Sequence, residues 1–213
     1  MLVLGDAHAD DPDNRRALFA AYRNSGADVA LQLGDLLYYD LPIPTYFIGG
    51  NNEDFDVIEA LRHGRVESTR VTNAFLLAGE TVGIDGLRVA GLSGNYAPTQ
   101  FERPRPNLHG ERRRHFVRED VEAAKQLDDV DVLLTHEAPN GLPVSESYDV
   151  GCEYIDELLD ALEPKLCLVG HHHEHAEGSY GDTRVVSLAP VWERYYHLDT
   201  TTLELTDYAT PSA

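Results

Sequence analysis

The sequence predicts an α/β protein in which two mixed β-sheets pack as a sandwich with helices on the outside. Short apolar runs alternate with helical patterns in the first half of the 213 residues, as in βαβ units. Hairpin-like and antiparallel strand patterns follow later in the chain. Hydrophobic residues make up 42% of the chain, enough for one sizeable core, so we expect a single domain over residues 1–213.

The elements of the first half follow from their apolar patterns and flanking residues. Leu2–Leu4 is predicted as a buried strand, and a helix over Asn14–Asn24 follows it. Asp11 is suited to cap this helix, Pro12 to its first turn, and Gly26 to its end. The next predicted elements are the strands Val29–Leu33 and Thr45–Ile48 and the short amphipathic helix Phe55–Leu61.

A β-hairpin is predicted where the alternation of strand and helix patterns ends. Thr81–Ile84 and Leu87–Leu92 flank an Asp-Gly pair, which readily adopts the positive φ angles of a tight turn. A polar, proline-containing loop is expected over Asn95–Asn107. The remaining predicted elements are helices over His115–Leu127 and Glu153–Leu162, strands over Val132–Leu134 and Leu166–Val169, and antiparallel strands near Arg184–Leu188, Tyr195–Asp199 and Leu203–Tyr208.

The composition is strongly acidic. Seventeen basic residues face 37 acidic ones, for a formal net charge of −20, and only Lys125 and Lys165 are lysines. A field of this sign repels nucleic acid and anionic membranes at ordinary salt. It therefore excludes a general nucleic-acid coat, but not an enzyme that engages a phosphate locally. High acid content with almost no lysine is also typical of cytoplasmic proteins of salt-accumulating halophiles.

The location is expected to be cytoplasmic. The start of the chain has too few apolar residues and no charge in front of them for a signal peptide, and no stretch approaches the ~20 apolar residues of a membrane span. Cys152 and Cys167 lack metal-ligand spacing and are predicted to be buried thiols. We expect no membrane contact and no stable protein partner, and the oligomeric state is left open.

Polar residues with metal-binding side chains follow five of the predicted strands. The carboxyl ends of strands in α/β sheets are where sites form. Oxygen and nitrogen donors without cysteine suit Mn, Fe, Zn or Ni. In extended backbone, residues i and i+2 point the same way, so each Asp-x-His or His-x-His pair can reach one centre. Two ions bridged by a shared carboxylate would use all seven groups, which are Asp6, His8, Asp35, Asn51, His136, His171 and His173.

These motifs, in this order, resemble those of the calcineurin-like metallophosphoesterases over residues 5–173. The resemblance implies that family's sandwich of mixed sheets flanked by helices, and metal-dependent phosphoester hydrolysis. Three further segments are similar to the RNA lariat debranching enzymes: Gly49-Gly50-Asn51 followed by Glu53, the run Gly86–Gly94, and Leu134-Thr135-His136 followed by Pro139.

The resemblance also implies a ligand set for two divalent metal ions, with manganese favoured and iron, zinc or nickel as alternatives. It implies that Asp35 bridges the ions and that a metal-bridging hydroxide attacks phosphorus in line. Many lariat debranching enzymes replace the first aspartate by cysteine, whereas this chain keeps Asp6. The implied ligands are Asp6, His8 and His173 for the first ion and Asn51, His136 and His171 for the second.

One position departs from the family pattern. The Gly-Asn motif commonly continues with a histidine that protonates the leaving oxygen, and here that position is Asn52. An amide has no proton to give at neutral pH, so His109, His115 or water would have to serve. Relatives without this histidine resemble phosphodiesterases, which favours nucleotide or RNA diesters, 2′–5′ linkages included. A phosphomonoesterase and a catalytically silent scaffold of the same fold remain alternatives.

A cluster of six arginines lies between Gln100 and Arg118. This segment has a local charge of +4, so the rest of the chain carries −24. It is either an exposed helix face that balances nearby acids or an edge that grips phosphate, because arginine binds phosphate oxygens bidentately. In lariat debranching enzymes the corresponding region meets the branched RNA. The candidate substrate-binding residues are Arg112, Arg113, Arg114, His109, His115 and Tyr38, the last because it follows Gly34-Asp35 closely.

Overall fold

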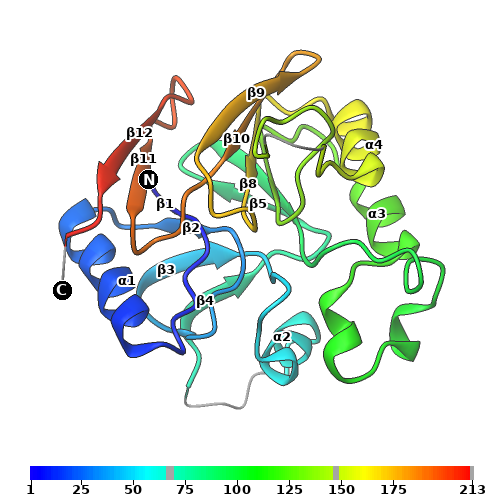
Figure 1. The fold of residues 1–213 in the computed structure, drawn as a ribbon, viewed down its shortest axis with the longest axis horizontal. Coiled ribbons are helices and arrows are strands. Elements are labelled where there is room, and N and C mark those ends of the chain that lie inside the picture. Colours follow the sequence, from blue (N-terminus) through cyan, green and yellow to red (C-terminus); the bar gives the residue numbers. More distant parts are fainter. Residues whose placement is uncertain (66–69, 146–148, 212–213) are drawn as a thin grey trace.

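Two six-stranded sheets face each other in this computed structural model, which describes residues 1–65, 70–145 and 149–211 (Figure 1). The first sheet contains, in spatial order, β12 (Leu205–Ala209), β11 (Arg194–Leu198), β1 (Leu2–Leu4), β2 (Ala30–Gln32), β3 (Asp40–Phe47) and β4 (Thr72–Leu76). The second contains β5 (Thr81–Ile84), β6 (Leu87–Leu92), β7 (Val132–Thr135), β8 (Leu166–Val169), β10 (Thr183–Ser187) and β9 (Ala176–Tyr180). Both sheets are mixed, which confirms the predicted fold class.

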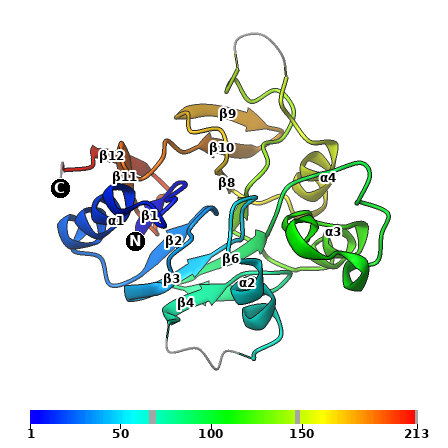
Figure 2. The ribbon, with the colours of Figure 1, turned by 60° about the horizontal axis from the view of Figure 1, so that its bottom comes forward.

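Helices cover the outer faces of the two sheets. In both views α1 lies at one end of the molecule, and α3 and α4 lie at the other (Figures 1 and 2). In the described residues the helices are α1 (Pro12–Ser25), α2 (Phe55–Arg62), α3 (Arg118–Ala124) and α4 (Glu153–Leu162), with the short 3-10 helices η1 (Arg105–Asn107) and η2 (Gly110–Arg114). No helix among them is long and apolar enough to cross a membrane.

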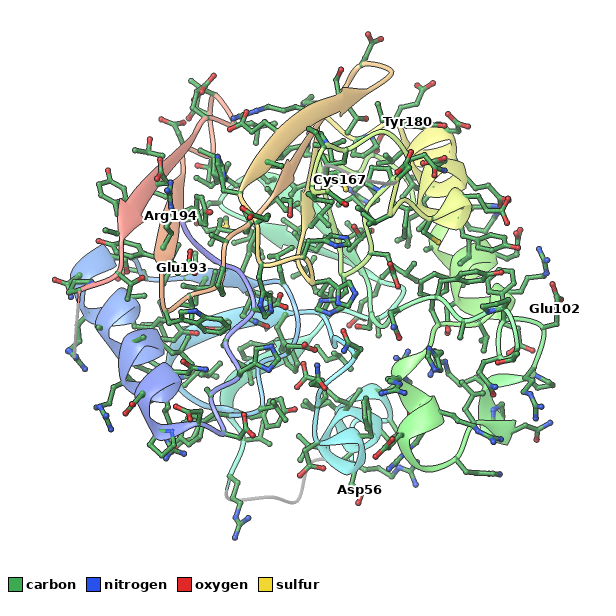
Figure 3. All side chains as sticks on the ribbon, viewed as in Figure 1. Asp56, Glu102, Cys167, Tyr180, Glu193 and Arg194 are labelled. Atoms are coloured by element: carbon green, nitrogen blue, oxygen red, sulfur yellow. The ribbon has the colours of Figure 1, made fainter. Side chains whose placement is uncertain are left out.

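The core consists of three apolar layers. Between the sheets, buried side chains such as Leu31 and Leu134 face one another. Leu18 of α1 packs on the outer side of the first sheet. Leu158 of α4 and Cys167 of β8 belong to the outer layer of the second sheet, and Figure 3 shows Cys167 inside the molecule. Both cysteines are buried and free, and burial raises the pKa of the Cys152 thiol to about 11, as expected of inert core thiols.

The helix that leads away from the first strand is capped as the sequence predicts. The Asp11 carboxylate accepts hydrogen bonds from the backbone N–H groups of Asp13 and Asn14, and Gly26 ends the helix with a φ of 63°. The Asp11 N–H also donates to the carbonyl of His8 at 3.1 Å. The cap therefore ties α1 to the loop that carries two of the predicted ligands.

Three features differ from the sequence predictions. α3 begins at Arg118 rather than His115, because residues 115–117 are extended and the Asp120 carboxylate accepts the Val117 N–H at 2.8 Å. The segment predicted as an antiparallel strand near Arg184–Leu188 is antiparallel to β9 but parallel to β8. The strands β4 and β9 were not predicted at all.

Candidate metal centre

Five loops at the carboxyl ends of parallel strands bring the predicted ligands together. Asp6 follows β1, Asp35 follows β2 and Asn51 follows β3 in the first sheet. His136 comes directly after β7, and His171 and His173 follow β8 in the second sheet. The site therefore lies where the carboxyl ends of both sheets meet.

Glycines allow these loops to approach one another. A Cβ at Gly50 would lie 2.1 Å from Asp35 Oδ1, and one at Gly170 would lie 2.8 Å from Asp6 Oδ1. Gly34 has a φ of 99°, and a Cβ there would lie 2.5 Å from His136 Nδ1. The glycine in front of each of these ligands thus leaves the space that a side chain from a neighbouring loop occupies.

Asp6, His8 and His173 form the first group. One potential ligand atom from each lies within 4.8 Å of those of the other two. Asp6 Oδ2 is 3.0 Å from His173 Nε2, and the rings of His8 and His173 meet edge to face at 5.4 Å. These are the three residues expected to hold one ion.

Asn51, His136 and His171 form the second group. Asn51 Oδ1 lies 2.9 Å from His136 Nε2, and the ring centroids of His136 and His171 are 4.9 Å apart. The other ring nitrogen of His136, Nδ1, lies 2.8 Å from the carbonyl oxygen of Leu33. Such a carbonyl contact fixes the ring and leaves Nε2 to face the site, as in protein metal centres.

Asp35 lies between the two groups. Its Oδ2 is 3.5 Å from His8 Nε2, and its Oδ1 is 3.6 Å from His136 Nε2. Asn52 donates to both carboxylate oxygens, from its backbone N–H and its side-chain amide, each at 2.7 Å. The two oxygens of the Asp35 carboxylate therefore face histidines of different groups.

The charge balance of the cluster fits bound cations. Asp6 and Asp35 are 1% and 2% exposed, and buried carboxylates need positive partners. Burial opposes ionisation of Asp6, but His136, His173 and the His171 amide offset it and hold the pKa of Asp6 below its ordinary value. The hydrogen bond to Asp6 raises the pKa of His173. Divalent cations would replace the protons on these histidines, and the oxygen and nitrogen donors suit such ions.

The backbone reason given for these motifs was wrong. Extended segments were expected to point residues i and i+2 to one centre. Instead, His8, His171 and His173 have φ angles of 42°, 71° and 55°, so the left-handed turns of loops aim them. The two side chains consequently contact different groups: the His171 ring contacts His136, and the His173 ring contacts Asp6.

Glu53 holds two loops of the centre together through hydrogen bonds, a role that was not predicted from the sequence. Its carboxylate accepts the N–H groups of Leu36, Leu37 and Gly50 at 3.1, 3.2 and 3.3 Å, and the hydroxyl of Tyr39. Burial raises its pKa to about 7. Glu53 therefore joins the Asp35 loop to the Asn51 loop. The Gly-Asn-x-Glu spacing was the only available signal.

Gln32 and Trp192 also support the centre without having been predicted. The Gln32 amide joins the loops of Gly5 and Gly34, donating to both carbonyls and accepting the Gly34 N–H. The Trp192 ring lies 5.8 Å from that of His8 and 5.3 Å from that of His173. A buried glutamine in a strand and a distant tryptophan carry no local sequence signature of this role.

The arginine segment lies against α2 and α3. Arg113 donates to Asp56 at 2.8 Å, Arg118 pairs with Glu102, and Asp56 and Glu102 lie at the periphery of the molecule (Figure 3). Arg105 is paired with Asp120. Acids therefore balance three of the six arginines. Arg112 is exposed, and Arg114, whose Nε is buried without a hydrogen-bond partner, lines a small cavity with Gly49 and Gly50 beside the Asn51 loop.

The two candidate proton donors, His109 and His115, belong to this segment. His109 is exposed at the start of η2, and His115 Nδ1 lies 3.3 Å from the carbonyl of Asn95. Burial lowers the pKa of His115. Neither has a hydrogen bond to a predicted ligand in the described residues. Tyr38 does not belong to this segment and packs against Phe19 of α1.

Comparison with known proteins identifies the class. A family model for calcineurin-like phosphoesterases matches residues 1–175. The lariat debranching enzyme of Entamoeba histolytica is 26% identical over 75% of this chain and 52% of its own length. That of Schizosaccharomyces pombe is 27% identical over 67% of this chain and 36% of its own length. That of Arabidopsis thaliana is 36% identical over 47% of this chain and 25% of its own length. The chain thus spans about half or less of these relatives.

Solved structures share the fold. The protein TT1561 of Thermus thermophilus superimposes with a TM-score of 0.69 at 19% identity, over 99% of this chain and 98% of that one. GAP50, the anchor in the inner membrane complex of Plasmodium, superimposes with a TM-score of 0.54 at 11% identity, over 100% of this chain and 88% of that one. With the family match, the fold and the ligand geometry, the chain belongs to the calcineurin-like phosphoesterases. Within that family it is similar in sequence to the lariat debranching enzymes.

Proposed function

We propose that this protein is a dinuclear metal-dependent phosphodiesterase that acts on nucleotide or RNA phosphodiesters, including 2′–5′ linkages. The observation that carries the proposal is the Asp35 carboxylate, which faces a histidine of each ligand group at 3.5 and 3.6 Å. One shared carboxylate between two groups of nitrogen and oxygen donors suits two ions. The similarity to lariat debranching enzymes supports an RNA diester as substrate.

The residues of the centre have separable roles in this proposal. Divalent ions, of which manganese is favoured, would lower the pKa of a bound water so that it can act as the nucleophile at neutral pH. They would also neutralise charge on the phosphoryl oxygens. Asp6, His8 and His173 would hold one ion, and Asn51, His136 and His171 the other. Glu53 keeps the Asp35 and Asn51 loops at a fixed separation through its backbone hydrogen bonds.

The resemblance makes Asn52 an argument for diesters over monoesters, because relatives without a histidine at this position resemble phosphodiesterases. Its amide donates to Asp35 and has no proton to transfer to a leaving oxygen. A leaving group that needs little protonation is therefore favoured. His109 or His115 could take the proton-donor role if the substrate brings the loop of η2 toward the centre, and Arg112, Arg113 and Arg114 would bind its phosphates from the same segment.

The acidic composition supports two further proposals about the setting. The net charge of −20 with two lysines suits a protein of a salt-rich cytoplasm. At molar salt the Debye length falls to about 3 Å, so local arginines rather than the total charge would govern substrate binding. Activity is therefore best measured at high salt.

The test is hydrolysis of bis-p-nitrophenyl phosphate by the manganese-loaded protein. We expect Asp35→Asn and His136→Ala to lower kcat by at least ~100-fold, because each removes a ligand of the centre. His63→Ala removes an exposed histidine at the end of α2 and is the matched control, with unchanged kcat. Manganese-dependent hydrolysis that survives both substitutions at the centre would refute the proposed function.

A further inference from the structure

A second arginine surface lies on α1, away from the segment at residues 100–118. Arg15, Phe19 and Arg23 recur every four residues and share one face of the helix. With Arg16 and Tyr38 they line a shallow surface groove of about 480 Å³. At 1.5 Å per residue, Arg15 and Arg23 are about 12 Å apart along the helix.

The groove combines unpaired positive charge with aromatic surface. In the described residues Arg16 pairs with Asp13, whereas neither Arg15 nor Arg23 pairs with an acid. The Arg15 guanidinium lies over the Tyr38 ring, 5.1 Å from its centroid. Phe19 meets the same ring edge to face at 5.8 Å. Both rings are half-buried, so each keeps exposed surface.

This combination is unusual for the chain. Acids outnumber bases by 37 to 17, yet two arginines with no acid partner among the described residues flank two accessible aromatic rings. Surfaces that bind single-stranded nucleic acid combine these features, because bases stack on aromatic rings and guanidinium groups bind phosphates.

Two features connect the groove to loops of the candidate metal centre: a hydrogen bond joins α1 to the His8 loop, and Tyr38 belongs to the loop that carries Asp35. Asn14, in the first turn of α1, lies with its amide nitrogen 3.5 Å from the carbonyl of the ligand His8. Tyr38 is three residues after the shared ligand Asp35. In Figure 1, α1 and the segment of η2 lie on opposite sides of the loops that carry the ligands.

We propose that the groove of Arg15, Phe19, Arg23 and Tyr38 binds a single-stranded segment of the nucleic acid beside the phosphodiester to be cleaved. Bases stack on Tyr38 and Phe19, and phosphates contact Arg15 and Arg23. This inference rests on the proposed function and deepens it, because it makes the substrate a polynucleotide strand rather than a small nucleotide diester.

The experiment measures binding of a fluorescent ten-nucleotide single-stranded RNA to the full chain by anisotropy, without added metal. We expect Arg15→Gln/Arg23→Gln to raise the Kd at least about tenfold. Arg65→Gln/Arg88→Gln removes the same charge from exposed arginines outside the groove and is expected to leave the Kd within about twofold. Equal binding by the wild type and the groove variant would overturn the proposal, as would equal loss in the control.

Stacking is tested at Tyr38. Tyr38→Ala is expected to raise the Kd about tenfold, and Tyr38→Phe, which keeps the ring, to restore it. An RNA duplex of the same length that binds more tightly than the single strand would contradict stacking. Hydrolysis of bis-p-nitrophenyl phosphate is measured in parallel and should not change in the groove variant. If the wild type hydrolyses no diester but its RNA affinity still depends on Arg15 and Arg23, the proposed function fails while the groove stands.

Discussion

Single glycines allow the close approach of the loops at the centre. Gly50 precedes Asn51 and leaves room for Asp35, whose backbone nitrogen and Oδ1 would lie 2.6 and 2.1 Å from a Cβ. The same Cβ would lie 2.8 Å from His136 Cε1. One methyl group would therefore displace the Asp35 carboxylate and the His136 ring together.

Gly50→Ala is expected to lower kcat for a small diester by about 100-fold, because displacement by about 1 Å in a catalytic site costs about that much. Gly83→Ala, in β5, meets nothing within 4 Å and serves as the control. Circular dichroism establishes that both variants fold. Full activity in the Gly50 variant would show that the close approach to Asp35 is not required.

Asn52 is expected to set the leaving-group preference. Asn52→His introduces a group that can protonate the leaving oxygen, and general acids contribute about 100-fold or more. We therefore expect the variant to gain about tenfold or more on alkyl esters relative to p-nitrophenyl esters, measured as the ratio of kcat/KM. Asn52→Ala removes the hydrogen bond to Asp35 without adding an acid and is the control. An unchanged ratio in the histidine variant would exclude this role.

The clustering of the candidate ligands could be predicted from sequence, because a short apolar run followed by Asp, Asn or His marks the carboxyl end of a strand. Glu53 and Gln32 could not be assigned their roles in the same way. Each joins two loops from different parts of the chain, and only the packed structure shows which backbone groups it reaches.

At the scale of elements, regular apolar patterns with clear end signals predict well. α1 has an aspartate cap and a glycine stop, and both occur as expected. β9 was missed because it is an edge strand with the sequence Ala-Glu-Gly-Ser-Tyr, which has no apolar alternation. β4 was missed because Asn73 has a φ of 57° and Phe75 is 45% exposed, so its pattern is irregular.

The cap of α1 connects helix stability to the metal centre. Asp11→Ala removes the acceptor for two backbone N–H groups and is expected to lower the free energy of unfolding by about 1 kcal/mol, measured by denaturant titration. Asp10→Ala changes the adjacent exposed acid and should have a much smaller effect. Equal losses in the two variants would indicate a charge effect rather than capping.

At the scale of the whole molecule, the charge of −20 is distributed unevenly. The segment between Gln100 and Arg118 carries +4, and the face of α1 adds two arginines without acid partners in the described part of the chain. In Figures 1 and 2, α1 lies at one end of the molecule and α3, which begins at Arg118, lies toward the other. The total charge therefore does not describe these two surfaces, whose local charge is positive.

Self-repulsion predicts a dependence of stability on salt. Raising potassium chloride from about 0.15 M to about 1 M shortens the Debye length from about 8 to about 3 Å, and we expect the Tm to rise. Differential scanning calorimetry measures it, with an equally concentrated neutral osmolyte as reference. A Tm that falls or stays constant in salt would contradict this account of the acidic surface.

The central claim is that two metal ions share Asp35 and that hydrolysis of a diester requires both. The direct measurement is a manganese titration of metal-free protein at high salt, with bound metal and hydrolysis of bis-p-nitrophenyl phosphate followed together. The account predicts two ions per chain, with activity that rises as the second ion binds and disappears with a chelator. Full activity with one ion, or hydrolysis by the metal-free protein, would contradict it.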